Sequence, residues 1–295
     1  MRSRVFLAFG VATAASVFLA VSALGAVSVD GTLDPDYGSA ITVQTINSGF
    51  GDSTVGDGTS SGGSELDAGY GIFQGGNLYL FLSGNFEANG NHLNIFISDG
   101  RAGQSTLAVP TTATMKAMNG SKFSPGFQAT MALDLNDFSG TEYVEEYNLT
   151  GTPSGGFAGS FALSGGIGTG SPGGSIMYGF NNRNAAGVNG TGGTAADAAA
   201  AQAVMTGLEV VIPLSLLGNP SGNVSVLADI NGGGDTFLSN QFLSGLPVGT
   251  SNLGNAGIFD FSSTPGEFFV VPEPSTLSLI GLGLGGLWYA RRRRA

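Results

Sequence analysis

Two stretches decide the fold of this chain: Asn77-Leu78-Tyr79-Leu80-Phe81-Leu82-Ser83 and His92-Leu93-Asn94-Ile95-Phe96-Ile97-Ser98. Both are rich in aliphatic and aromatic residues, and the second alternates polar with apolar side chains. This pattern is typical of β-strands. The short segment from Asn85 to Asn91 between them predicts that they pair as a β-hairpin.

Further strand candidates follow at similar intervals, at residues 40–46, 69–74, 127–133, 142–149, 157–163, 175–180, 207–212, 223–230 and 267–271. Glycine makes up about a sixth of the chain, and Gly-Gly, Asn-Gly and Ser-Gly pairs separate the candidates. We therefore expect an all-β fold, an antiparallel β-sandwich or jelly roll. We expect the alanine-rich residues 194–205 to form a short surface helix, and the glycine-dense residues 51–63 and 165–174 to form loops.

The C-terminal tail has three parts in a fixed order. Pro272, Glu273 and Pro274 come first, an apolar stretch follows at 275–290, and a basic cluster precedes the last residue: Arg291, Arg292, Arg293 and Arg294. Basic residues beside a membrane helix stay in the cytoplasm, so the arginines predict a cytoplasmic stop with the rest of the chain across the membrane.

Residues 272–295 resemble the PEP-CTERM sorting signal of Gram-negative bacteria in all three parts. The resemblance implies an exosortase-type processing enzyme as a partner, with cleavage near the proline-glutamate-proline motif. It also implies an association with exopolysaccharide and the biofilm matrix. Until it is processed, such a protein is held in the membrane by its C-terminal transmembrane sorting helix.

A permanent membrane anchor is the alternative interpretation of the tail. Residues 275–290 give a helix of 16 residues, about 24 Å long, whereas the hydrocarbon core of a bilayer is about 30 Å thick. Four glycines weaken this helix by about 1 kcal/mol each relative to alanine. A short, glycine-rich span favours a transient signal.

The N-terminus indicates a secretory signal peptide. Arg2 and Arg4 precede an apolar stretch at 5–21, and Ala23-Leu24-Gly25 offers a cleavage site of small residues. An uncleaved membrane helix is the alternative. We therefore divide the chain into a signal peptide at 1–26, a β-sandwich ectodomain at 27–271 and the sorting segment at 272–295.

The charge of the predicted ectodomain is strongly negative. Without the two ends it keeps four basic residues against twenty acidic ones, a formal net charge of −16. Such a body repels phosphate backbones, which argues against nucleic acid as a partner. Cysteine is absent, so disulfides, thiolate metal sites and a cysteine nucleophile are excluded.

A second resemblance rests on two short motifs and on the predicted paired strands around Tyr79 and Phe96, which lie between them. Val29-Asp30-Gly31-Thr32-Leu33-Asp34 opens the body, and Leu208-Glu209-Val210-Val211-Ile212-Pro213-Leu214 lies late in it. Their order is similar to that in family-9 carbohydrate-binding modules and related DOMON-like β-sandwiches. The resemblance implies a β-sandwich that holds sugar between aromatic rings. This chain departs from the pattern because its single tryptophan, Trp288, belongs to the tail.

The sequence favours no catalytic site, so we do not expect an enzyme. His92 is the only histidine, and its place at a strand start predicts an ordinary structural residue. The densest acid groups are Glu145-Glu146 and Asp134 with Asp137. Adjacent strand residues point to opposite faces, so Glu145 and Glu146 cannot act on one substrate as a glycosidase pair.

One loop suggests a structural calcium ion, and no other cofactor is expected. Asp229, Asn231 and Asp235 place oxygen donors around a glycine turn, a partial match to calcium-binding loops. Residues 52–58 and 134–137 are alternative sites. A hairpin turn with capping aspartates explains the same residues without a metal.

These observations predict an exported structural protein of the cell surface or extracellular matrix, carried through the inner membrane to the cell envelope. The alternative is a non-catalytic module that binds exopolysaccharide. Its stacking rings would come from the tyrosines of the body, whose role in strands is more often packing: Tyr37, Tyr70, Tyr79, Tyr143, Tyr147 or Tyr178.

Overall fold

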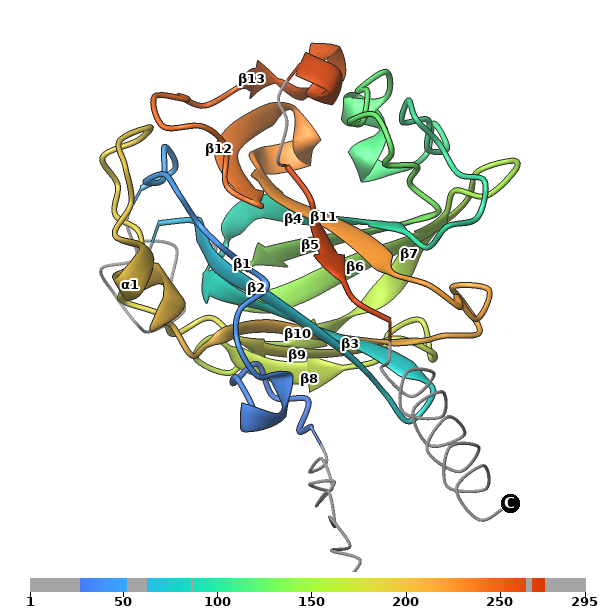
Figure 1. The fold of residues 1–295 in the computed structure, drawn as a ribbon, viewed down its shortest axis with the longest axis horizontal. Helices are drawn as coiled ribbons and strands as arrows, with labels where there is room; N and C mark the ends of the chain where they lie inside the picture. The colour runs from blue at the N-terminus through green and yellow to red at the C-terminus, as the bar shows by residue number, and fades with distance from the viewer. Residues whose placement is uncertain (1–26, 52–62, 86, 264–266, 274–295) are drawn as a thin grey trace, which may run out of the picture.

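The computed structural model describes residues 27–51, 63–85, 87–263 and 267–273 (Figure 1). The predicted signal peptide and the tail from Pro274 onward lie outside these residues, as do residues 52–62. Within the described part, no helix has the length and apolar character needed to cross a membrane.

Two antiparallel sheets make up most of this structure, as the sequence predicts. The smaller sheet has six strands in the order β1 (Thr42–Val43), β2 (Glu65–Gln74), β3 (Asn77–Asn85), β10 (Gly207–Pro213), β9 (Met177–Asn181) and β8 (Ile167–Gly170). Figure 1 shows this sheet below the larger one, with their broad faces together.

The larger sheet has eight strands. Seven of them follow the order β13 (Gly254–Asn255), β12 (Phe237–Leu243), β11 (Val224–Asn231), β4 (Asn89–Ser98), β5 (Met131–Phe138), β6 (Thr141–Asn148) and β7 (Ser154–Ala162). The eighth, β14 (Phe269–Val271), pairs with the first part of β11.

The predicted hairpin between residues 77–83 and residues 92–98 is wrong. β3 pairs with β2 and β10, whereas β4 pairs with β5 and β11, so the chain passes from one sheet to the other between them. The partner of β3 in a hairpin is β2, because Gly75 and Gly76 adopt positive φ angles of 57° and 85° and form the two-residue turn that such a hairpin requires.

The core lies between the inner faces of the two sheets. Leu80 and Val210 from the smaller sheet share one buried cluster with Ile95, Leu133 and Val226 from the larger sheet. Residues 77–83 and 92–98 therefore pack against each other through apolar side chains across the sandwich. They share no backbone hydrogen bonds. This is why both have a strong apolar period although they do not pair.

Several strands and the helix have boundaries that differ from the predicted ones. The 40–46 candidate contains only β1, the 127–133 candidate begins at Met131, and the 165–174 loop holds β8. The predicted helix at 194–205 shortens to α1 (Ala198–Gln202), where the Asp197 side chain accepts hydrogen bonds from the first-turn amides. β12 has no counterpart among the predicted strands.

The two short motifs of the second resemblance meet in space. The backbone amides of Asp30 and Gly31 donate to Oε2 of Glu209 on β10, at 2.7 and 2.9 Å. The Tyr37 hydroxyl, in the 3-10 helix η1 (Pro35–Tyr37), donates to Oε1 at 3.1 Å. Glu209 thus fastens the N-terminal segment to the smaller sheet. Burial raises the pKa of its carboxyl to about 7 despite these donors.

Loop segments cover part of the outer face of the larger sheet. They carry three short 3-10 helices, η2 (Thr114–Met118), η4 (Ala256–Ile258) and η5 (Phe261–Ser263). Phe123 and Phe261 of these segments form a second apolar cluster with Phe96, Leu227 and Tyr147 of the sheet. The rest of the outer face is polar, and it lies beside the turn that contains η3 (Gly233–Asp235).

Candidate functional site

Two rows of polar side chains cross the outer face of the larger sheet. Register places the members of each row opposite one another on β11, β4, β5 and β6: Asp229, Asn94, Asp134 and Glu145 in the first row, and Asn231, His92, Asn136 and Tyr143 in the second. Residues two apart on a strand share a face, so the two rows form one continuous polar surface.

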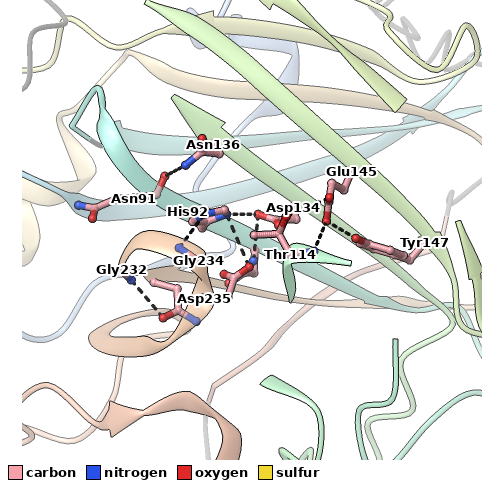
Figure 2. A network of polar contacts seen from close by, with 12 residues as sticks. Asn91, His92, Thr114, Asp134, Asn136, Glu145, Tyr147, Gly232, Gly234 and Asp235 are labelled. Atoms are coloured by element: carbon pink, nitrogen blue, oxygen red, sulfur yellow. Dashed lines mark hydrogen bonds and ion pairs between the residues drawn. The ribbon is translucent and has the colours of Figure 1, made fainter. Parts of the chain in front are cut away.

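The turn between β11 and β12 adds a further carboxylate, from Asp235. Gly234 and Asp235 both adopt positive φ angles, of 67° and 54°, which bend the turn over the sheet. Figure 2 shows Asp235 pointing toward His92 and Asp134. His92 Nδ1 lies 2.7 Å from Asp134 Oδ1 and 3.6 Å from Asp235 Oδ2, and the Gly234 amide donates to His92 Nε2 at 3.2 Å.

The carboxylates of this cluster are deeply buried. Asp134 is 2% exposed, and Asp229 and Asp235 are fully covered. Both oxygens of Asp229 lack a hydrogen-bond partner within the described residues. Burial raises the pKa of Asp134 to about 8, with a further contribution from Glu145. Burial and then the neighbouring acids raise the pKa of Asp229 and of Asp235 well above the usual range.

A pocket of about 490 Å³ opens above this cluster. His92, Asp134 and the Gly233-Gly234 turn line its base, and Asn89, Thr114, Asn136 and Glu145 line its walls. Three exposed aromatic residues also line it: Phe138, Tyr143 and Phe157. The rings of Tyr143 and Phe157, on neighbouring strands, have centroids 6.4 Å apart and planes inclined by 36°. The pocket therefore combines a polar interior with apolar rings open to solvent.

Glu145 and Glu146 face opposite sides of β6, as strand alternation predicts. Glu145 accepts hydrogen bonds from the amide and hydroxyl of Thr114, both at 3.0 Å, and from the Tyr147 hydroxyl (Figure 2). Glu146 instead accepts from the Tyr178 hydroxyl at 2.9 Å. The two carboxylates thus have different partners on the two faces of the strand.

The calcium site predicted from the sequence has its oxygen donors on Asp229, Asn231 and Asp235 of one loop. The structure brings Asp229 and Asp235 into the cluster, while Asn231 Oδ1 accepts from the Gly232 amide at 3.1 Å. Of the alternative sites, Asp134 belongs to the cluster. Asp137 stands opposite Glu142 in the register of β5 and β6, on the other face of the sheet from Asp134. Residues 52–58 lie outside the described residues.

His92 was expected to be an ordinary strand-end residue, but it lies inside β4. It is buried against two of the acids of the cluster. Among the tyrosines considered as stacking faces, Tyr143 lines the pocket, Tyr79 is half-buried, and four are buried: Tyr37, Tyr70, Tyr147 and Tyr178. The exposed rings of Phe138 and Phe157 were missed, because an apolar residue in a strand predicts burial.

The start of the tail is exposed. Pro272 and Glu273 follow β14 directly, and the Glu273 amide donates to Asn223 Oδ1 at 3.0 Å. Pro274 and the basic residues Arg291, Arg292, Arg293 and Arg294 lie outside the described residues. The first two residues of the motif are thus accessible immediately after the last strand.

Comparison with known proteins supports a sorting signal at the C-terminus. The fold and tail define an all-β protein with a C-terminal sorting signal. A family model of the PEP-CTERM protein-sorting motif matches residues 270–294. The chain therefore carries a PEP-CTERM sorting motif at its C-terminus, which implies export, processing by an exosortase-type enzyme and attachment to the cell envelope or surface. No curated protein and no solved structure matches the chain.

Proposed function

We propose that the sandwich is a non-catalytic exopolysaccharide-binding module, and that the exported protein is a structural component of the extracellular matrix. The single observation that carries this proposal is the pair of exposed rings, Tyr143 and Phe157, beside a polar pocket. Their side chains are 40% and 65% exposed, although strands normally bury such residues. Sugar rings have an apolar face that stacks on aromatic rings.

The pocket walls supply the other half of sugar recognition. Asn89, Asn136 and Thr114 offer amide and hydroxyl groups to a ligand rich in hydroxyls. The base of the pocket carries carboxylates, and the body as a whole is acidic. We therefore expect a neutral polysaccharide, because a polymer of uronic acids would be repelled.

The same geometry favours binding without hydrolysis. A glycosidase needs one carboxyl group that donates a proton and a second that is free to attack or to activate water. Glu145 is occupied by Thr114 and Tyr147. Asp134 is held by His92 and by Asn94, whose Nδ2 donates at 3.3 Å.

Affinity electrophoresis of the full chain in gels that contain neutral or acidic polysaccharides tests the proposal. We expect a neutral polymer to retard the wild type, and Phe157→Ala to weaken binding about tenfold, a loss of about 1.4 kcal/mol. Phe237→Ala is the matched control: Phe237 is 47% exposed and stacks on Phe50, but it lies outside the pocket.

Equal mobility of the wild type in every gel would contradict glycan binding by this pocket. The proposed role as a matrix protein would remain. Release of reducing sugar by the wild type would contradict the non-catalytic assignment. Mass spectrometry of the exported protein separates processing from a permanent anchor. A C-terminus close to Pro272 would keep β14 and hence the whole larger sheet.

A further inference from the structure

We propose that Asp134, Asp229 and Asp235 bind one calcium ion, with Asn94 Oδ1 as a further ligand and His92 as a positioning residue. The ion would tie the β11–β12 turn to β5 at the base of the pocket. This inference goes beyond the proposed function, because it holds whether or not the pocket binds a glycan.

The first argument is charge. Three carboxylates share one buried space, and in the described part of the chain no lysine or arginine forms an ion pair with any of them. Burying unpaired charges is costly, so such groups are normally paired or coordinate a metal. A divalent cation offsets two of the three negative charges.

The second argument is the set of polar atoms left without partners. Both oxygens of Asp229 and the Oδ1 atom of Asn94 are buried and accept no hydrogen bond within the described residues. Asp229 and Asn94 stand opposite each other in the register of β11 and β4, and Asn94 stands opposite Asp134 on β5. Two adjacent strands thus carry buried oxygens without partners beside Asp134 on the third strand, and such unsatisfied groups are rare in native proteins.

Distance supports a shared ion. One nitrogen of His92 and one carboxylate oxygen each of Asp134 and Asp235 lie within 4.8 Å of one another. Calcium binds oxygen at about 2.3–2.6 Å, so two ligands of one ion lie within about 5.2 Å of each other. The first of these distances joins Asp134 on β5 to Asp235 on the turn, and the Asp229 carboxylate on β11 lies near enough to both that their charges raise its pKa.

The hydrogen bonds of His92 identify the kind of metal. Its Nε2 accepts the Gly234 amide proton, so in the neutral ring Nδ1 carries the proton and donates to Asp134. A metal on Nδ1 would leave the ring without any proton. His92 therefore orients the Asp134 carboxylate, and the ligands that remain are all oxygens. Oxygen ligands favour calcium over zinc, which prefers nitrogen and sulfur.

The test compares melting temperatures of the full chain in detergent after removal of metal and after addition of calcium, magnesium or zinc. Calcium at about ten times its Kd should raise the Tm by about 3–6 °C. Magnesium, which demands a stricter octahedral geometry, should do less. Isothermal titration should give one calcium per chain, and it needs no variant.

Two isosteric variants complete the design. Asp229→Asn removes a proposed ligand charge and should abolish the calcium-dependent shift. Glu209→Gln removes a buried carboxylate whose oxygens are already hydrogen-bonded, and should keep the shift in full. Three results would overturn the proposal: no calcium shift in the wild type, a larger shift with zinc than with calcium, or a full calcium shift in Asp229→Asn.

Discussion

Glu209 and Asp229 are both fully buried, each on a central strand of one of the two sheets, yet their surroundings differ completely. The oxygens of Glu209 accept three hydrogen bonds, from two backbone amides and a tyrosine hydroxyl. The oxygens of Asp229 accept none within the described part, and two other acids stand close to it. The chain satisfies the first carboxylate by itself and leaves the second to a ligand.

The comparison separates a structural acid from a binding acid. In sequence the two look alike, since Leu208-Glu209-Val210 and Ala228-Asp229-Ile230 each place one acid between apolar strand residues. Only the partners distinguish them. A buried carboxylate that has its donors stabilises the fold, whereas one without donors destabilises it unless a cation or a proton neutralises it.

The largest effect is expected from deletion of the satisfied acid. Glu209→Ala leaves the amides of Asp30 and Gly31 without an acceptor and opens a cavity on β10. We expect the free energy of unfolding to fall by about 2–4 kcal/mol. Urea unfolding measures this, and a loss below about 0.5 kcal/mol would mean that the N-terminal segment does not depend on Glu209.

The unsatisfied acid should respond in the opposite direction. With metal removed, Asp229→Asn replaces a buried acid that lacks hydrogen-bond partners by a neutral amide. This removes the cost of burying or protonating the acid and should raise the free energy of unfolding by about 1 kcal/mol. The same urea experiment in chelator measures it. Destabilisation of the variant in chelator would mean that Asp229 has partners in the folded chain, and the contrast with Glu209 would disappear.

A third effect is a dependence on pH that comes from Glu209. Its pKa is about 7 in the folded protein against an ordinary value of 4.5, so the folded state keeps a proton that the unfolded state releases. Its contribution to stability is complete below about pH 4.5 and is lost as the pH rises to about 7. Glu209→Gln should remove this part of the profile.

Unfolding of the wild type and the variant at constant calcium, from pH 4 to pH 8, isolates the contribution of Glu209. The free energy of the wild type should fall relative to that of the variant between about pH 4.5 and 7. Parallel profiles would show that the Glu209 carboxyl titrates alike in the folded and unfolded chains.

Linear patterns were the predictable part of this molecule. The sorting tail is a continuous motif, and the alternation of His92-Leu93-Asn94-Ile95 marks a strand with one apolar face. Three strands were not predicted because they lack that signal: β8, β12 and the two-residue β13. β8 contains Gly168 and Gly170, and a side chain at Gly170 would collide with the ring of Phe161. β12 buries Asn240 and Gln241, which bond to backbone groups of neighbouring segments.

The candidate site was only half visible for the same reason. Asp229 and Asp235 flank one glycine turn, so their proximity could be inferred from spacing. Asp134, Asn94 and His92 join them only because β11, β4 and β5 are neighbours in the sheet. Strand order depends on packing across the whole sandwich, and no local pattern encodes it. The misassigned hairpin between β3 and β4 has the same origin.

A crystal structure of the protein grown in calcium chloride tests the central claim most directly. We predict one ion bound to oxygens of Asp134, Asp229 and Asp235 at about 2.3–2.6 Å, with His92 donating to Asp134 from outside the coordination shell. Carboxyl groups joined by short hydrogen bonds, with no ion among them, would show that protons neutralise this cluster and would contradict the account.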